Sequence, residues 1–263
     1  MGMLRDIWNY RGFILGSVKR EFQLKYRNSL LGAAWTVLNP LAMILVYTVI
    51  FSQVMHNRLP GNPNQYSFSI YLCSGLLTWN LFSEIVGRSQ VMFLEHANLI
   101  KKINFPRNCL PIIVVLNACL NFWIVFGIFT LFLIGTSNFP GWAFLAIFPL
   151  LLLQVFFAIG LGVNIGVLNV FFRDIGQFFN IFLQFWFWLT PVVYVLSIVS
   201  PKIQAFMFLN PMTGLIQSYQ GIFVEGQWPD WLSLLPLAAI SFVLCFLGIK
   251  LFRSRIHEME DEL

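Results

Sequence analysis

Long stretches of this chain contain no Asp, Glu, Lys or Arg, and they limit the solvents in which it can fold. The longest runs from Asn108 to Phe172, and others cover 59–83, 175–201 and 231–249. Charged residues make up 10% of the 263 residues, against about 25% in a soluble domain. Because about 20 apolar residues cross the hydrocarbon core as a helix, and no barrel-type alternation is visible, these runs predict membrane helices.

We predict an all-α membrane protein with six transmembrane helices. The expected spans are 30–54, 67–87, 108–134, 142–170, 177–197 and 232–252. This arrangement puts fourteen of the 16 Lys and Arg residues in the inner segments and leaves Arg58 and Lys202 outside. Since Lys and Arg are retained on the cytoplasmic side, we expect a multi-pass protein with both termini in the cytoplasm. Topology and anionic lipid then explain the net charge of +5, without a nucleic-acid partner.

The first 29 residues are predicted to form an amphipathic interface helix ahead of a transmembrane domain at 30–263. Apolar residues recur near helical spacing within 4–27, among basic residues, as in helices that lie in the headgroup plane. The alternative is a cytoplasmic helix packed on a partner. The segment has no apolar stretch before a cleavage site, so no signal peptide is expected.

Two connecting segments carry their own predictions. The inner loop 95–107 contains Leu99, Ile100 and Ile103, which form one apolar face of a short helix that Pro106 ends. Such a helix suits docking to a soluble partner, although a solvated loop fits equally well. The segment 198–230 contains two apolar stretches too short to cross, so we predict a re-entrant external hairpin that gates a pathway. Its alternative is an interfacial external loop.

Catalytic and metal-binding patterns are not evident. The sequence has no phosphate loop and no HExxH, GxSxG or GxGxxG motif, and no two histidines have metal spacing. We therefore expect no catalytic residues, metal or cofactor in this chain. The four cysteines are expected to be buried thiols. Glu84 and Arg88 have the i, i+4 spacing of a structural ion pair. Without midplane coupling groups, transport would need energy from a separate ATPase subunit.

Aromatic residues are the positive signal, with 29 Phe, 9 Trp and 7 Tyr. Aromatic rings offer flat apolar faces, and Trp and Tyr add a polar edge. They can stack on sugars without holding any one hydroxyl, so a polymer could slide past. The alternative is lipid-facing bulk and interfacial belts. The expected channel-lining residues lie in spans one and five: Trp35, Tyr47, Phe51, Phe185, Trp186, Trp188 and Tyr194.

Three motifs in the expected order resemble ABC-2 type permeases that export polysaccharides. KYRNSLLGAAWTVLNPL at 25–41 resembles the entry to their first span, FRDI at 172–175 their inner loop between spans four and five, and LNPMTG at 209–214 the segment after span five. The likeness covers about residues 5–255. It is closest to the O-antigen exporters of Gram-negative bacteria, and capsule and teichoic acid exporter permeases look similar.

The resemblance implies a homodimer in the bacterial inner membrane with a channel between its subunits, and two copies of a separate subunit that binds ATP and Mg. The cargo would be a polysaccharide linked to a polyprenyl diphosphate lipid. The inner loop would be the coupling helix, with Glu95, His96, Leu99, Ile100 and Ile103 toward the ATPase. The hairpin would be the external gate, at Asn210, Pro211, Met212 and Gly214. Lys25 and Arg27 could meet the lipid diphosphate.

Two other functions remain open from sequence. A membrane-embedded glycosyltransferase would need clustered acidic residues, and Asp6, Glu95 and Asp174 are scattered. An ABC permease for a drug or a small lipid would less often need so aromatic a passage. The sequence does not identify the sugar repeat, its cap, whether the ATPase reads that cap, or which aromatic residues face the channel.

Overall fold

The computed structural model describes residues 8–25, 31–50, 59, 64–101 and 107–262. Within these ranges the regular structure is helical, as predicted. The helices are α2 (Arg11–Lys25), α3 (Trp35–Thr48), α4 (Ser67–Glu95), α5 (Ala97–Ile100), α6 (Cys109–Gly135), α7 (Ile147–Phe171), α8 (Asp174–Trp188), α9 (Pro201–Phe208), α10 (Pro211–Glu225) and α11 (Leu235–Glu262), with short 3-10 turns at Gly32–Ala34, Gly141–Ala146 and Leu196–Ile198.

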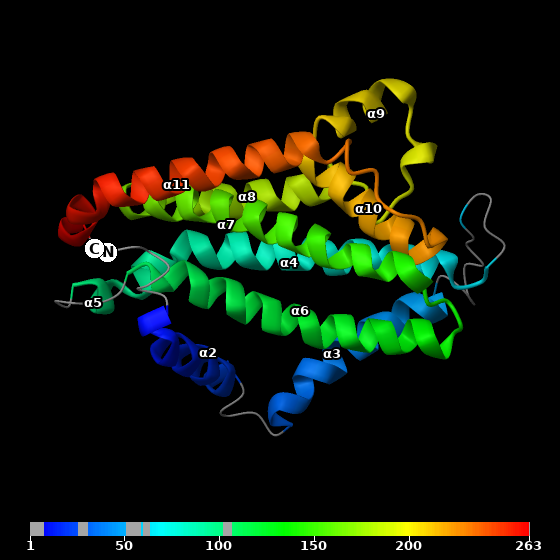
Figure 1. The fold of residues 1–263 in the computed structure, drawn as a ribbon, viewed down its shortest axis with the longest axis horizontal. Helices are drawn as coiled ribbons and strands as arrows, with labels where there is room; N and C mark the ends of the chain where they lie inside the picture. Colours follow the sequence, from blue (N-terminus) through cyan, green and yellow to red (C-terminus); the bar gives the residue numbers. More distant parts are fainter. Residues whose placement is uncertain (1–7, 26–30, 51–58, 60–63, 102–106, 263) are drawn as a thin grey trace.

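The long helices lie side by side and define two ends of a bundle (Figure 1). At one end, which we call the α5 end, lie α5, the start of α6 and the last turns of α11. At the other, the hairpin end, lie α9 and α10, and α10 packs against α4, α7 and α11. The arrangement separates two regions with different chemistry, one basic and one aromatic.

Three helical segments of the described chain are long and apolar enough to cross a membrane: Cys109–Gly135, Gly141–Phe171 and Leu235–Ile256. They match the predicted spans 108–134, 142–170 and 232–252. The other three predicted spans differ more. α3 has 14 residues and α8 has 15, fewer than the roughly 20 that a crossing needs. The count of six spans therefore stays a prediction.

Helix α4 continues well past the end predicted for the second span, residue 87, and reaches Glu95. Its polar last turns are stabilised by side chains of other helices. Gln90 donates through Nε2 to Asn180 Oδ1 at 2.6 Å, and Asn169 Nδ2 donates to the carbonyl of Gln90 at 2.8 Å. Hydropathy shows where the apolar surface ends, whereas these hydrogen bonds to other helices stabilise the polar turns beyond it.

The fifth span was predicted to end at residue 197, but helix α8 ends at Trp188. The reason is Pro191, which has no N–H to donate and clashes with the preceding helical turn. The chain then turns, and Tyr71 Oη donates to the carbonyl of Tyr194 at 2.9 Å, which holds the turn against α4. The prediction for this end was wrong because the apolar run continues through the proline.

Small residues let α4, α7 and α11 approach closely. A Cβ added at Gly166 would lie 2.4 Å from the carbonyl oxygen of Ser89 on α4, and one at Gly162 would lie 2.5 Å from Ser89 Cβ. On the opposite side of α7, a Cβ at Gly160 would lie 2.9 Å from Cys245 Sγ on α11. Glycines spaced four apart are a common device for close packing between membrane helices, and here they place α7 at the centre of the bundle.

Candidate functional site

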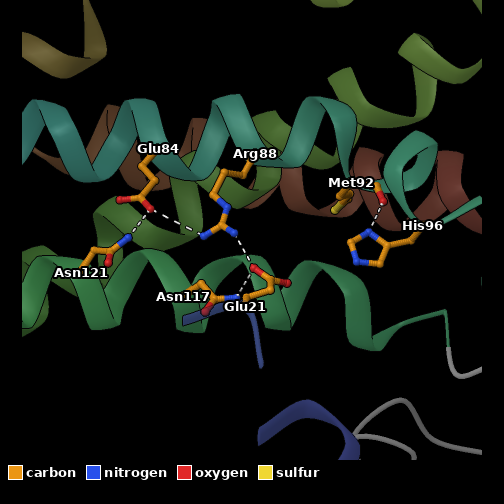
Figure 2. A network of polar contacts seen from close by, with 7 residues as sticks. All are labelled: Glu21, Glu84, Arg88, Met92, His96, Asn117 and Asn121. Carbon is orange, nitrogen blue, oxygen red and sulfur yellow. Dashed lines mark hydrogen bonds and ion pairs between the residues drawn. The ribbon is translucent and has the colours of Figure 1, made fainter. Parts of the chain in front are cut away.

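A polar network joins α2 to the long helices α4 and α6 (Figure 2). Arg88 of α4 forms an ion pair with Glu21 of α2, and its guanidinium also lies 3.7 Å from Glu84. Asn117 of α6 donates to Glu21 at 2.8 Å, and Asn121 donates to Glu84 at 2.6 Å. One cation thus lies between two carboxylates, each of which also accepts a hydrogen bond from an asparagine.

The predicted Glu84–Arg88 ion pair is therefore present, but the shorter contact of Arg88 is with Glu21, which the sequence analysis missed. The available signal was that Glu21 is one of only two acidic residues in the basic segment 1–27. The pair links residues 67 positions apart. Helical spacing identifies partners within one helix only, so this contact needed the tertiary structure.

Apolar contacts place α2 beside α6. Ile14 and Val18 pack against Cys109 and Ile113, whereas Leu15 is 63% exposed. Apolar residues thus lie on both sides of α2, one side toward the protein and the other away from it. Between α2, α4 and α6 lies an open pocket of about 590 Å³, lined by the polar network together with Glu95, His96, Met92 and apolar side chains.

Glu21 and Arg88 are expected to be energetically coupled. The pair is about one-third exposed, so we expect a coupling free energy of about 1 kcal/mol. Thermal unfolding of Glu21→Gln, Arg88→Gln and the double variant in detergent measures it. Arg255→Gln is the control, because Arg255 pairs with Glu258 on the exposed end of α11. Strictly additive effects of the two substitutions would show that the contact does not fix α2.

The predicted coupling residues lie at the α5 end. Glu95 is exposed at the last turn of α4, and His96 Nδ1 lies 2.8 Å from the carbonyl of Met92 (Figure 2). Ile100 is buried with Met92, Phe93 and Leu110 in the chain's own core, while Leu99 is half-buried. A partner would therefore meet α5 chiefly through its polar side. Four predicted positions lie outside the described residues or have undescribed side chains: Lys25, Arg27, Phe51 and Ile103.

At the hairpin end, aromatic residues and hairpin residues line one pocket of about 540 Å³. Its lining includes Phe182, Trp186, Trp188, Tyr194, Phe206, Asn210 and Pro211. The structure thus brings together two sets that the sequence analysis predicted separately. Among them, Trp186 packs against the core, with its ring edge-on to Trp79, Phe82 and Phe157.

Asn210 fixes the corner of the hairpin. Its Oδ1 accepts from Trp186 Nε1 at 2.8 Å and from the Met212 backbone N–H at 3.0 Å, which caps α10. Its Nδ2 donates to Thr190 Oγ1 at 2.8 Å. Pro211 takes the first helical position, where no N–H is needed. This corner therefore sets the position of the hairpin relative to the end of α8.

Behind this corner, α10 is buried. Met212, Thr213 and Tyr219 are inaccessible to solvent, Gly214 lies in the same helix, and Gln220 donates to the carbonyl of Pro191 at 3.2 Å. By contrast α9 exposes Phe206 and Phe208. The packing shields the backbone of α10 with protein, which is the condition for irregular structure at membrane depth.

The aromatic residues of α3 lie elsewhere in the single chain. α3 packs on α6 and α4, and Tyr47 lines a separate pocket of about 180 Å³ with Cys73 and Phe129. Trp35 is exposed. The predicted channel residues of spans one and five therefore do not share one surface within one copy of the chain.

These features define the class of protein: a multi-pass helical membrane protein with a basic end and an aromatic end. Residues 14–224 match the family model described as ABC-2 type transporter. The chain belongs to the ABC-2 type transporter family.

Three similar curated proteins carry names of export or transport proteins. The O-antigen export system permease protein RfbA of Myxococcus xanthus is 34% identical over 99% of both chains. A protein of the same name from Klebsiella pneumoniae is 28% identical, with 89% of this chain and 88% of that one covered. The polysialic acid transport protein KpsM of Escherichia coli is 24% identical, with 91% and 92% covered.

Proposed function

We propose that this chain is the transmembrane permease subunit of an ABC exporter that moves a polysaccharide of the O-antigen type, linked to polyprenyl diphosphate, across the bacterial inner membrane. A separate ATPase subunit supplies the energy. The observation that carries the proposal is the 34% identity with an O-antigen export permease along 99% of both chains. Membership of a transporter family disfavours the glycosyltransferase alternative, and the similarity to O-antigen permeases exceeds that to the polysialic acid protein.

An exposed aromatic face on α8 supports a polymer pathway. Phe178, Phe182, Phe185 and Leu189 follow the i, i+4, i+7, i+11 spacing of one helix face, and all four are exposed in the single chain. Phe179, Trp186 and Phe187 on other sides of α8 pack against the core. The exposed face can contact lipid or a second copy of the chain. Because aromatic rings can stack on sugar rings, this face is also suited to form the wall of a channel for a polysaccharide.

In a homodimer, the aromatic residues of α3 and of α8 can line one channel although they lie apart within a single copy. A two-fold axis brings the same surface of each copy together, so that α3 of one copy can meet α8 of the other. Trp35, Tyr47, Phe185 and Trp188 would then line a common passage. Asn210 and Trp186 would hold the hairpin as its external gate.

The α5 end fits the cytoplasmic side. Arg107 precedes α6, Arg173 lies between α7 and α8, and Lys250 and Arg253 lie in the second half of α11. These parts of the helices lie toward the α5 end (Figure 1), whereas Lys202 belongs to α9 in the hairpin. Both termini would be cytoplasmic, α2 would be the interface helix of residues 1–29, and the segment 95–107 would contact two copies of the ATPase. Lys25 and Arg27 are assigned to the lipid diphosphate; unchanged export after replacing both with Ala would remove that assignment.

Deleting the gene is expected to abolish surface polysaccharide while lipid-linked polymer accumulates inside the cell. Export failure leaves synthesis intact, so the polymer is still made. Gel analysis of surface polysaccharide and extraction of the lipid-linked fraction measure both pools. Complementation with the wild-type gene is the control, and failure to make any polymer would support an enzyme instead.

The same assay tests the aromatic face. Phe178→Ala with Phe185→Ala should lower surface polysaccharide several-fold at unchanged protein level, because both rings lie on this exposed face of α8 and their loss leaves the core intact. The matched control, Trp142→Ala with Phe148→Ala, removes two exposed rings away from α8 and should export normally. Equal export by both pairs would contradict a channel role for α8.

A further inference from the structure

An apolar groove that no residue of α8 lines is not used by the proposed pathway. It lies between α6, α7 and α11 and has a volume of about 380 Å³, within the range of about 300–1,000 Å³ of small-molecule sites. Its walls include Val115, Leu116, Phe156, Ile159 and Ile249, and Gly160 and Cys245 belong to its lining. In a membrane protein such a groove accepts hydrocarbon.

The groove has the length of one leaflet. Along α7 it extends from Leu152 to Val163, which at 1.5 Å per residue is about 16 Å. Half of a hydrocarbon core is about 15 Å. The groove therefore suits one acyl chain of a phospholipid that runs parallel to the helices.

Its α5 end is polar and basic. Asn108 and Arg253 are the two polar side chains that line it there. Asn108 is the N-cap residue of α6, and its side chain makes no capping hydrogen bond to that helix. Because this is the N-terminus of α6, the positive end of the helix dipole also lies at this end of the groove. Arg253 is exposed and makes no ion pair with a carboxylate among the described residues, whereas Arg255 pairs with Glu258.

We propose that this groove binds an anionic phospholipid, with an acyl chain along Val115 and Ile159 and the phosphate at Arg253 and Asn108. The orientation rests on the proposed function, which puts the α5 end at the cytoplasmic leaflet, where anionic lipids are found. The acyl chain of a zwitterionic lipid fits the apolar part of the groove equally well, but its headgroup, which has no net charge, is attracted less strongly to Arg253. The bound lipid fills the space between α6 and α11 and so supports the packing of both against α7.

Native mass spectrometry of the purified full-length chain, with added phosphatidylglycerol or phosphatidylcholine, tests the headgroup. Arg253→Gln should lower the preference for phosphatidylglycerol about fivefold. The matched control is Lys250→Gln, which removes a charge from the same helix at an exposed position outside the groove and should leave the preference unchanged. An equal loss in both variants, or none in either, would overturn the proposal in favour of diffuse attraction to basic residues.

A photoactivatable phosphatidylglycerol with its reactive group in the acyl chain tests the groove in the wild-type chain. Labelled peptides should come from α6 and α7 around Val115 and Ile159, and Val115→Trp should remove the label. Leu131→Trp, at an exposed position of α6 outside the groove, should keep it. Labelling spread evenly over the exposed helices would overturn the proposal, whether or not the chain exports polysaccharide.

Discussion

Gly166→Ala is expected to lower the thermal stability of the chain more than an alanine at any other described glycine. The new Cβ would lie 2.4 Å from the carbonyl oxygen of Ser89, and backbone atoms cannot rotate away as a side chain can. α4 and α7 must separate, which strains the hydrogen bond from Asn169 to Gln90. Overpacking of this kind costs about 1–3 kcal/mol, or a fall of roughly 2–12 °C in Tm for a chain of this size.

Fluorescence-detected size-exclusion chromatography after heating measures this effect in detergent. Gly127→Ala on α6 is the matched control, because a Cβ there meets no atom within 4 Å. Ala favours the helix over Gly by up to about 1 kcal/mol, so the control should be as stable as the wild type or more. If both variants melt together, the close approach of α4 and α7 is not what holds the centre of the bundle.

Asn210→Ala is expected to abolish most export and to destabilise the chain. It removes the N-cap of α10, worth about 1 kcal/mol, and leaves Trp186 Nε1–H without its acceptor, which costs about 1–3 kcal/mol. The total is about 2–4 kcal/mol. The hairpin is then no longer fixed to the end of α8, so the gate is displaced even in chains that stay folded. Surface polysaccharide per folded chain is the measurement.

Asn210→Asp separates the two effects. It keeps the oxygen that accepts from Trp186 and Met212, and it loses the donor to Thr190. We expect intermediate stability and partial export. Gln227→Ala controls for loss of an exposed amide near the hairpin. Normal export by Asn210→Ala at normal protein level would contradict a role for this corner in gating.

The sequence predicted elements best where apolar runs are bounded by local turn signals. The span 108–134 differs from α6 by one residue at each end, and the span 142–170 differs by one residue at each end from the helical segment Gly141–Phe171, which combines a 3-10 turn with α7. The turn between the two spans uses positive φ at Ser137 and Gly141. The two short apolar stretches predicted within the segment 198–230 likewise correspond to α9 and α10, which begin at Pro201 and Pro211. These signals are local, so the sequence displays them directly.

Predictions failed or stayed incomplete where the structure depends on contacts between residues that are far apart in the sequence. Hydropathy did not show that α4 extends to Glu95, because that extension depends on Asn180 and Asn169. It also did not reveal Glu21 as the partner of Arg88. The burial of Ile100 in the chain's own core, which leaves α5 to meet a partner by other residues, is equally a consequence of packing by α6, α7 and α11.

The sequence alone determined that this chain belongs in a bilayer and is helical. Charge-free runs of this length need an apolar solvent, and without the alternation of a β-barrel only a helix satisfies their backbone hydrogen bonds there. It also determined which end is basic. The tertiary structure decided which polar groups meet: Glu21 with Arg88, Asn210 with Trp186, and Arg253 with the mouth of an apolar groove. The reason is physical, because periodicity fixes the face on which a side chain lies, whereas its partner depends on how separate helices pack.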